Sequence, residues 1–261
     1  MKFARQFWRI TRMLSLLLLG LLIVFFLFPR WDSKARARMV KRWSIWLLSA
    51  LHIQIKQHRG HALYDQCLGD IDASRAQQYI TVANHISWLD IFVINAVAPM
   101  RFVAKADIRD WPLVGPLCAG TGTIFIERQK RTALRDVIVI VKQALKAGDR
   151  VAVFPEGTTG DTKSIRAFHS NFLQVAVDEQ LTVLPLAMRY VDAKTGGVSD
   201  ATLFIDDTTF IKSCLQVCGE PQIIAELFFT EPIAPSAQWT RQSLSHRSRE
   251  QICGALGLPT D

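Results

Sequence analysis

The sequence has 261 residues, of which 49% are hydrophobic and 21% are charged. This composition excludes a disordered chain, a collagen-like repeat and a small disulfide-rich protein. The net charge of +8 is unevenly distributed, because residues 1–60 hold twelve Lys and Arg against one Asp, a local charge of +11. These bases flank the most apolar stretch of the chain, so we expect them to meet anionic membrane lipids rather than nucleic acid.

The longest apolar stretch, residues 13–29, contains no charge and has four bases before it and Arg30 after it. As a helix it is about 26 Å long, slightly short of a hydrocarbon core of roughly 30 Å. It therefore spans a thin bilayer or lies within one leaflet. A cleaved signal peptide is disfavoured, because the run ends in Phe-Pro-Arg-Trp at residues 28–31, without a small-residue cleavage pattern.

A second helix is expected from the spacing of apolar residues that follow a basic beginning, namely Trp43, Trp46, Leu47, Ala50 and Leu51. Indole rings favour the headgroup boundary and bases favour acidic lipid, so we interpret this segment as an amphipathic helix on the membrane surface. An ordinary core helix with a solvated basic end is the alternative. We therefore expect residues 1–57 to form membrane-anchoring helices.

From residue 52 onward, short apolar runs alternate with helical stretches, which predicts an α/β domain with a central mixed sheet flanked by helices. This domain is expected over residues 58–235, followed by a polar tail of weak helical character over residues 236–261. A clear amphipathic helix covers residues 134–145 and stops at Gly148. The expected strands are residues 53–55, 79–83, 101–104, 123–126, 151–154, 182–190, 203–205 and 223–229.

The five cysteines are odd in number and form no C-x-x-C motif, which predicts neither a disulfide framework nor a zinc site. Cys214 and Cys218 are spaced one helical turn apart. We expect both to pack as small apolar side chains on a buried face rather than to bind a metal. A reducing compartment fits this usage.

The first segment that suggests chemistry is Asn-His-Ile-Ser-Trp-Leu-Asp at residues 84–90. His85 and Asp90 would point about 140° apart on a regular helix, so they meet only if His85 precedes the first turn. We expect Ser87 to be the N-cap that sets this boundary. Asp90 would then orient one ring nitrogen of His85 while the other takes a proton from a hydroxyl. The alternative is a capping box, in which Asp90 only satisfies a backbone N–H.

Two further segments lie where expected strands end. Residues 154–160 read Phe-Pro-Glu-Gly-Thr-Thr-Gly, and residues 122–128 read Gly-Thr-Ile-Phe-Ile-Glu-Arg. Glycines permit close backbone approach, and α/β folds bind ligands where strands end. The guanidinium of Arg128 suits a phosphate, although a surface Arg also commonly pairs with a nearby acid.

Taken together and in this order, these segments resemble the glycerophospholipid acyltransferase family, most closely the bacterial 1-acyl-sn-glycerol-3-phosphate acyltransferases. The resemblance covers roughly residues 53–190, and its motifs form a specific set. His85 and Asp90 match the H-x4-D motif of the family. Residues 154–157 match its F-P-E-G block, residues 122–128 its G-x-x-F-I-x-R block, and residues 183–186 its V-x-P-V-like strand.

The resemblance implies transfer of a fatty acyl group from acyl-CoA or acyl carrier protein to the free hydroxyl of a lysolipid. His85 would be the general base and Asp90 its orienting partner. No metal and no cofactor beyond the acyl donor is implied, and the location is the cytoplasmic face of a bacterial inner membrane. No G-x-S-x-G motif is present, which favours direct attack by the acceptor over an acyl-enzyme.

The resemblance also assigns the polar head of the acceptor to Arg128, Glu156, Gly157 and Thr158. Lys105 is a further candidate for the phosphate or for the thioester carbonyl. A solvated lysine at a strand end is an equally good interpretation of Lys105.

One departure from the family pattern concerns the acceptor. The family commonly reads F-P-E-G-T-R, whereas this chain has Thr159 at the position of the Arg. A neutral hydroxyl cannot give a bidentate, charge-assisted contact. Phosphate affinity must then come from Arg128, Lys105, Lys163 or Arg166, or the acceptor lacks a phosphate monoester. Lyso-ornithine lipid acyltransferases are therefore a close alternative, and a non-catalytic lipid-binding protein is an alternative of another class.

Overall fold

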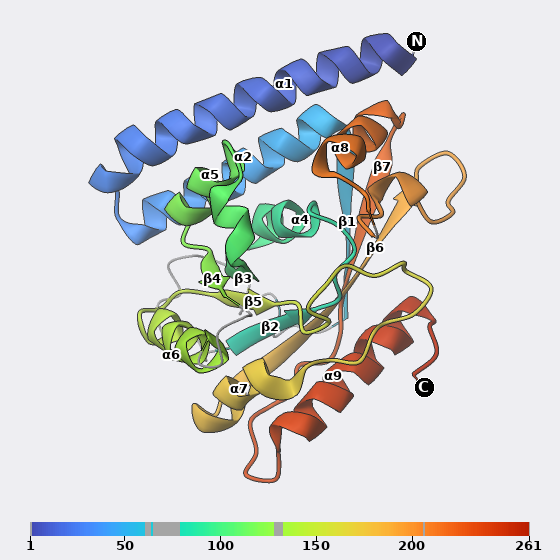
Figure 1. Cartoon of the computed structure of the whole chain (residues 1–261). Coiled ribbons are helices and arrows are strands. Elements are labelled where there is room, and N and C mark those ends of the chain that lie inside the picture. Colours follow the sequence, from blue (N-terminus) through green and yellow to red (C-terminus); the bar gives the residue numbers. More distant parts are fainter. Residues whose placement is uncertain (1, 61–63, 65–78, 128–132, 206, 261) are drawn as a thin grey trace.

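The structure is a computed structural model that describes residues 2–60, 64, 79–127, 133–205 and 207–260. Its centre is a seven-stranded sheet of order β1-β7-β6-β2-β5-β3-β4 (Figure 1). Neighbouring strands are parallel except β6 and β7, so the expected mixed sheet is confirmed. The strands are β1 Ile53–Arg59, β2 Tyr79–Ala83, β3 Arg101–Lys105, β4 Ile124–Ile126, β5 Val151–Val153, β6 Thr182–Asp192 and β7 Ile223–Phe229.

Helices cover both faces of this sheet, with α4 and α8 on one side and α6, α7 and α9 on the other (Figure 1). The strand β2 shows why, because Ile80 and Val82 join one apolar cluster and Tyr79 and Ala83 join the other. Alternate residues of a strand point to opposite faces, and here both faces are apolar. The helices are α4 Asp90–Val97, α5 Val114–Gly120, α6 Ala133–Lys146, α7 Gln174–Asp178, α8 Phe210–Gly219 and α9 Arg241–Leu256, with short 3-10 turns η3 Ala106–Asp110, η4 Ser170–Leu173 and η5 Asp200–Thr202.

The prediction of a strand at residues 203–205 is wrong. These residues form an irregular segment after η5. The N–H of Phe204 donates to the carbonyl of Ile86 at 3.3 Å, and the carbonyl of Phe204 accepts from the hydroxyl of Thr159. Because its polar groups pair with two loops instead of with a strand, the segment lies against residues that precede α4 and follow β5.

The N-terminal apolar stretch forms one helical run, in which α1 Lys2–Leu22 continues through η1 Ile23–Leu27 and η2 Phe28–Arg30. By length and composition this run could cross a membrane. It lies along the body of the protein instead of projecting from it, packed on α8 and on α2 Ser33–Leu51 (Figure 1). The guanidinium of Arg9 donates to the carbonyls of Glu220 and Pro221, and that of Arg5 donates to Gly219. These contacts fix α1 to the end of α8.

The expectation of a second membrane-surface helix is wrong for most of α2. Leu47, Ala50 and Leu51 are each 1% exposed, and α2 packs closely on α4. The apolar face that the spacing shows is therefore turned to the core, as in the alternative interpretation. Trp46 keeps 38% of its surface exposed, so only one N-terminal helix, α1, remains a candidate for the bilayer.

The cysteine pair behaves as expected, because α8 buries both Cys214 and Cys218 in the core. Burial raises the pKa of Cys214 to about 12 and that of Cys218 to about 11. Within the part of the chain that the structure describes, no three His, Cys, Asp or Glu side chains group as metal ligands would.

The polar tail contains α9, which Thr240 caps at its N-terminus together with Ser243. This helix packs on β6 and buries Ile252 and Cys253. The boundaries proposed at residues 57 and 235 stay predictions.

Candidate active site

The candidate site lies at the carboxyl ends of three neighbouring parallel strands, β2, β5 and β3. Residues 84–89, which we call the His85 loop, connect β2 to α4. Asn84 fixes the start of this loop, because its amide donates to the carbonyl of Met188 at 3.0 Å and accepts from the N–H of Met188 at 2.8 Å. The loop thus leaves the sheet at a position that β6 sets.

His85 precedes the helix, as its spacing from Asp90 requires, but the expected N-cap at Ser87 is wrong. The helix α4 begins at Asp90, and Leu89 occupies the cap position without a side-chain bond. The reason is that Asp90 itself accepts the N–H groups of Ile86 at 2.7 Å and Ser87 at 3.0 Å. The carboxylate folds the loop back over the start of its own helix.

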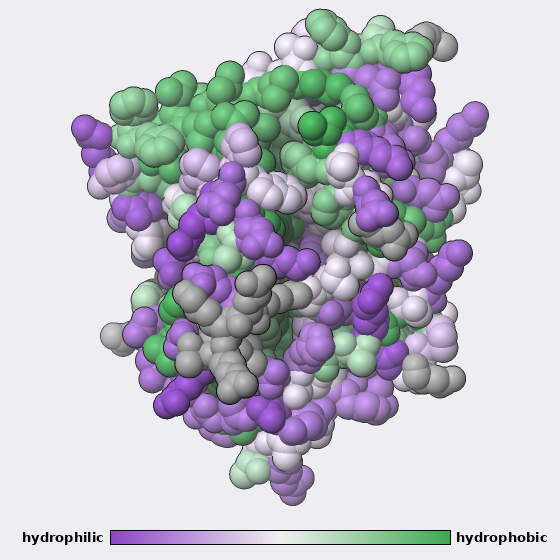
Figure 2. All heavy atoms as spheres, in the orientation of Figure 1, coloured by the Kyte–Doolittle hydropathy of each residue, from purple (hydrophilic) through white to green (hydrophobic). Residues whose placement is uncertain are grey.

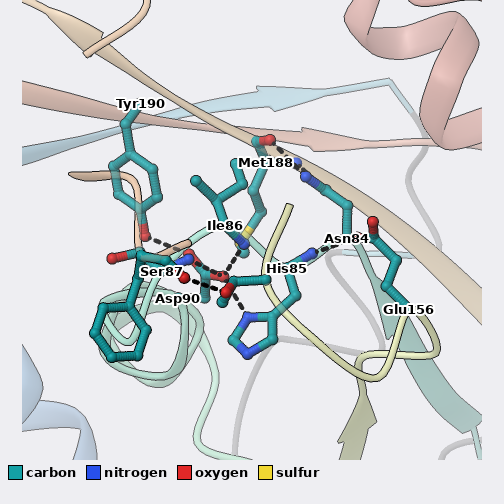
Figure 3. Close-up of polar contacts among 10 residues, drawn as sticks. Asn84, His85, Ile86, Ser87, Asp90, Glu156, Met188 and Tyr190 are labelled. Atoms are coloured by element: carbon teal, nitrogen blue, oxygen red, sulfur yellow. Dashed lines mark hydrogen bonds and ion pairs between the residues drawn. The ribbon is translucent and has the colours of Figure 1, made fainter. Parts of the chain in front are cut away.

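The carboxylate of Asp90 is fully buried and accepts four donors (Figure 3). Its Oδ2 lies 2.8 Å from Nδ1 of His85, and its Oδ1 accepts the hydroxyl of Tyr190 at 2.7 Å. Burial and the adjacent Asp90 raise the pKa of Tyr190 well above its usual range, so the phenol keeps the proton that it donates. A carboxylate that faces Nδ1 assigns the proton to that nitrogen. Asp90 therefore does both things that the sequence suggested: it accepts backbone N–H groups and it orients the ring of His85.

The plane of the His85 ring is set by Phe154, which stacks on it with ring centroids 4.2 Å apart and planes 14° apart. Phe102 supports Phe154 from β3, at 5.8 Å between centroids. The side chain of His85 is 21% exposed, and its Nε2 has no hydrogen-bond partner among the residues described. The ring is thus fixed on one edge and on one face, and the edge that carries Nε2 is left to act as a base.

Glu156 is only 4% exposed, and backbone donors occupy both of its oxygens. The N–H of His85 donates to Oε1 at 2.8 Å, and the N–H of Arg166 donates to Oε2 at 3.0 Å. Burial raises the pKa of Glu156, while these two bonds oppose that rise. The carboxyl group therefore ties the His85 loop to the segment after β5, and contact with an acceptor stays a prediction.

The remaining candidate residues are less fully positioned. Gly157 turns the chain after β5 with φ of +71°, a conformation that favours glycine, and Thr158 is half-buried beside it. Lys105 is exposed at the end of β3, on the same edge of the sheet. Arg128 lies outside the described residues. The hydroxyl of Thr159 is engaged by the carbonyl of Phe204.

Sequence reasoning missed three residues that position the His85–Asp90 dyad, namely Tyr190, Phe154 and Asn84. Tyr190 is one hundred residues from Asp90, so no local spacing could link them. Asn84 and Phe154 belong to segments that the sequence analysis recognised. Asn84 directly precedes His85, and Phe154 lies two residues before Glu156, so their position in these segments was the available signal.

A family model described as Acyltransferase matches residues 66–189. The lyso-ornithine lipid O-acyltransferase of Pseudomonas aeruginosa is 30% identical over 255 residues, which cover 95% of this chain and 92% of that protein. The chain belongs to the glycerophospholipid acyltransferase family.

Two other members of the family point the same way. The 1-acyl-sn-glycerol-3-phosphate acyltransferase of Neisseria meningitidis is 38% identical over 113 residues, 43% of this chain and 44% of that protein. The crystal structure of the 1-acyl-sn-glycerophosphate (LPA) acyltransferase from Thermotoga maritima aligns with a TM-score of 0.62 at 22% identity, over 95% of this chain and 96% of that one. This protein is accordingly an acyltransferase of the lysophospholipid type.

Proposed function

We propose that this acyltransferase moves a fatty acyl group from an acyl thioester, carried by coenzyme A or acyl carrier protein, to the free hydroxyl of 1-acyl-sn-glycerol-3-phosphate, giving phosphatidic acid. The observation that carries the proposal is the orientation of His85, whose Nδ1 lies 2.8 Å from Asp90 while Nε2 stays open. Direct acyl transfer needs a positioned base beside an incoming hydroxyl, and this geometry supplies one.

In the proposed reaction, Nε2 of His85 removes the proton of the acceptor hydroxyl as its oxygen attacks the thioester carbonyl. Asp90 stabilises the imidazolium that forms, without itself taking the proton. The tetrahedral intermediate then expels the thiolate, which receives the proton back from Nε2. No group of the protein is acylated, and the products are the diacyl lipid and the free thiol.

We place the enzyme on the cytoplasmic face of a bacterial inner membrane, with α1 lying in one leaflet. The outer face of α1 and η1 exposes large apolar side chains, which Figure 2 shows as a band along the top of the molecule. Soluble surfaces rarely expose apolar patches of this kind. Arg9 holds the helix against the body of the protein. A position in the leaflet preserves these hydrogen bonds and also lets lipid cover the apolar side chains of the outer face. The exposed side chains are Phe3, Phe7, Trp8, Leu14, Leu18, Leu19, Leu22, Phe25, Phe26 and Leu27.

A second acceptor, a lyso-ornithine lipid, is favoured by two observations. The relative from Pseudomonas aeruginosa carries that activity in its name and aligns over nearly its whole length. This chain has Thr159 where the family commonly has Arg. The hydroxyl of Thr159 donates to the carbonyl of Phe204, and the side chain supplies no charge for a phosphate.

A competition experiment distinguishes the two acceptors. Both are offered to the enzyme at equal concentration with one acyl-CoA, and the products are identified by mass spectrometry. We expect phosphatidic acid as the main product, and roughly 10²- to 10⁴-fold less of it from His85→Ala. Acylated ornithine lipid without phosphatidic acid would reject the phosphate acceptor and leave the roles of His85 and Asp90 intact. Thr159→Arg should strengthen use of lysophosphatidate and weaken use of the cationic acceptor.

Arg128 gives a second test of the phosphate acceptor. Arg128→Ala should raise KM for lysophosphatidate roughly 10- to 150-fold, the effect of losing one charge-assisted hydrogen bond. KM for the acyl thioester should change far less. Equal changes in both constants would assign Arg128 to the structure of the site instead of to the acceptor.

A further inference from the structure

A groove with a volume of about 420 Å³ runs between α1 and α2, which lie side by side at the top of Figure 1. Three kinds of side chain line it. Trp8 and Trp46 contribute indole rings, Arg12 contributes a guanidinium, and Ser15 and Ser49 contribute hydroxyls. Neither helix supplies a residue to the His85 site, so the groove is a separate feature of the molecule.

Arg12 differs from Arg5 and Arg9, the two arginines that precede it on α1. The guanidinium groups of Arg5 and Arg9 donate to backbone carbonyls at residues 219–221. Arg12 is exposed and has no hydrogen bond or ion pair with any described residue. Trp8 lies one helical turn before it and belongs to the outer face that we place in the leaflet. At the level of the lipid head groups, anionic phosphates are the partners available to this guanidinium.

We propose that this groove binds the head group of an anionic phospholipid, with the guanidinium of Arg12 on its phosphate. The proposal rests on the membrane attachment proposed above. A planar guanidinium can give two parallel hydrogen bonds to phosphate oxygens. The indoles of Trp8 and Trp46 pack at the level of lipid head groups. The local charge of +11 in residues 1–60 attracts the same class of lipid.

The hydroxyls in the groove add a preference for head groups that donate hydrogen bonds. The proton of Thr11 goes to the carbonyl of Phe7, and that of Ser15 goes to the carbonyl of Thr11, each at 2.9 Å. Their oxygens can still accept. A glycerol head group carries a phosphate for Arg12 and hydroxyl donors for Thr11 and Ser15, so phosphatidylglycerol is the probe that the groove fits.

The test is flotation of the full-length enzyme with phosphatidylcholine vesicles, with and without phosphatidylglycerol, at low and at high salt. Arg12→Gln removes the proposed contact, and Arg38→Gln removes an exposed base of α2 outside the groove. We expect Arg38→Gln to weaken binding to the anionic vesicles roughly fivefold at low salt, and to match the wild type at high salt. Arg12→Gln should weaken it roughly 10- to 150-fold and keep a deficit at high salt, because a contact inside a groove is screened less.

A second variant separates the groove from its charge. Ser15→Phe fills the groove and leaves Arg12 in place, and we expect it to lose the preference for phosphatidylglycerol while still floating with phosphatidylcholine. The proposal is overturned if Arg12→Gln behaves like Arg38→Gln, if Ser15→Phe keeps the full preference, or if the wild type floats equally with both kinds of vesicle. A wild-type protein that floats with neither would overturn the membrane attachment as well.

Discussion

The His85 loop and the outer face of α1 differ in whether the protein itself supplies partners for their side chains. In the loop, four donors from the protein itself converge on the buried Asp90. On α1, side chains such as Phe3 and Phe7 are 85% and 74% exposed and have no protein surface to cover them. The polar groups of the loop therefore have partners within the protein, whereas the position in a leaflet proposed for α1 would cover apolar side chains that the described part of the protein leaves exposed.

This difference implies that catalysis and attachment can be removed independently. Substitutions in the loop should change the rate and leave the protein on the membrane. Substitutions on the outer face of α1 should release the protein and leave the rate on a dispersed acceptor unchanged.

The largest expected effect belongs to His85→Ala, which removes the open imidazole edge that we propose as the base. A positioned base contributes roughly 10²- to 10⁴-fold to a rate, so kcat should fall by that factor while the melting curve and vesicle flotation stay normal. Steady-state acyl transfer measured beside thermal unfolding checks this. A variant that keeps near wild-type turnover would exclude His85 as the base.

The opposite side of the comparison is tested by the double substitution Phe25→Gln with Phe26→Gln. These rings are 62% and 61% exposed in η1. Each buried aromatic contributes about 1.5–3 kcal/mol, so vesicle binding should fall roughly 10²- to 10⁴-fold, with unchanged activity on an acceptor dispersed in detergent.

The matched control for that prediction is the pair Val139→Gln with Ile140→Gln. These two residues are also neighbours and exposed, at 48% and 41%, but they lie on α6 on the other side of the sheet. The control should bind vesicles as the wild type does. Equal loss in both pairs would mean that general surface hydrophobicity, and not the outer face of α1, holds the protein on the membrane.

The sequence predicted the sheet and the dyad because both depend on local signals. Strands appear as apolar runs, and the spacing of His85 and Asp90 requires the helix to begin after His85, although it did not identify Asp90 as the first helical residue. The segment at residues 203–205 shows the limit, since its apolar pattern is that of a strand but its backbone pairs with Ile86 and Thr159.

The helix α2 and Tyr190 show two other limits. The spacing of Leu47 and Leu51 identifies an apolar face, but a lipid and a protein core are equally apolar neighbours, so periodicity cannot say which one covers it. Tyr190 reaches Asp90 only because β6 lies next to β2 in the sheet. Contacts of that kind depend on strand order, which the spacing of residues in one sequence does not contain.

A smaller effect on rate is expected for Tyr190→Phe, which removes one of the four donors on Asp90. The carboxylate is then held less firmly against Nδ1 of His85. We expect kcat to fall roughly tenfold, as for loss of one hydrogen bond to a charged group, with KM for both substrates nearly unchanged in steady-state acyl transfer.

Tyr64→Phe is the matched control for Tyr190→Phe. Tyr64 is equally buried, and its hydroxyl donates to the carbonyl of Pro185 at 2.6 Å, away from the dyad. We expect it to lose stability but to keep the wild-type kcat. If both variants leave kcat unchanged, or lower it equally, Tyr190 has a structural role only.

The smallest expected effect concerns Glu226 on β7, which is nearly buried and binds Arg189, Lys56 and His58. Burial works to raise the pKa of Glu226, but hydrogen bonds from these three residues outweigh it and lower the pKa to about 2. Since the network has no contact with the His85 loop, Glu226→Gln should affect stability and leave kcat and vesicle binding unchanged.

The pH dependence of that loss follows from the sign of the shift. A carboxyl group whose pKa is lowered in the folded state stabilises the protein above the pKa of its unfolded form, about 4.3, and loses this contribution as the pH falls. Glu226→Gln should therefore lower the free energy of unfolding by about 1–3 kcal/mol at pH 7, toward the lower end because Lys56 and Arg189 are partly exposed. Denaturant unfolding of both proteins should show this gap closing between the unfolded pKa and the folded value of about 2. A gap that stays constant over that range would mean that the carboxylate charge contributes nothing, and a change in kcat would show that polar networks outside the loop also control the rate.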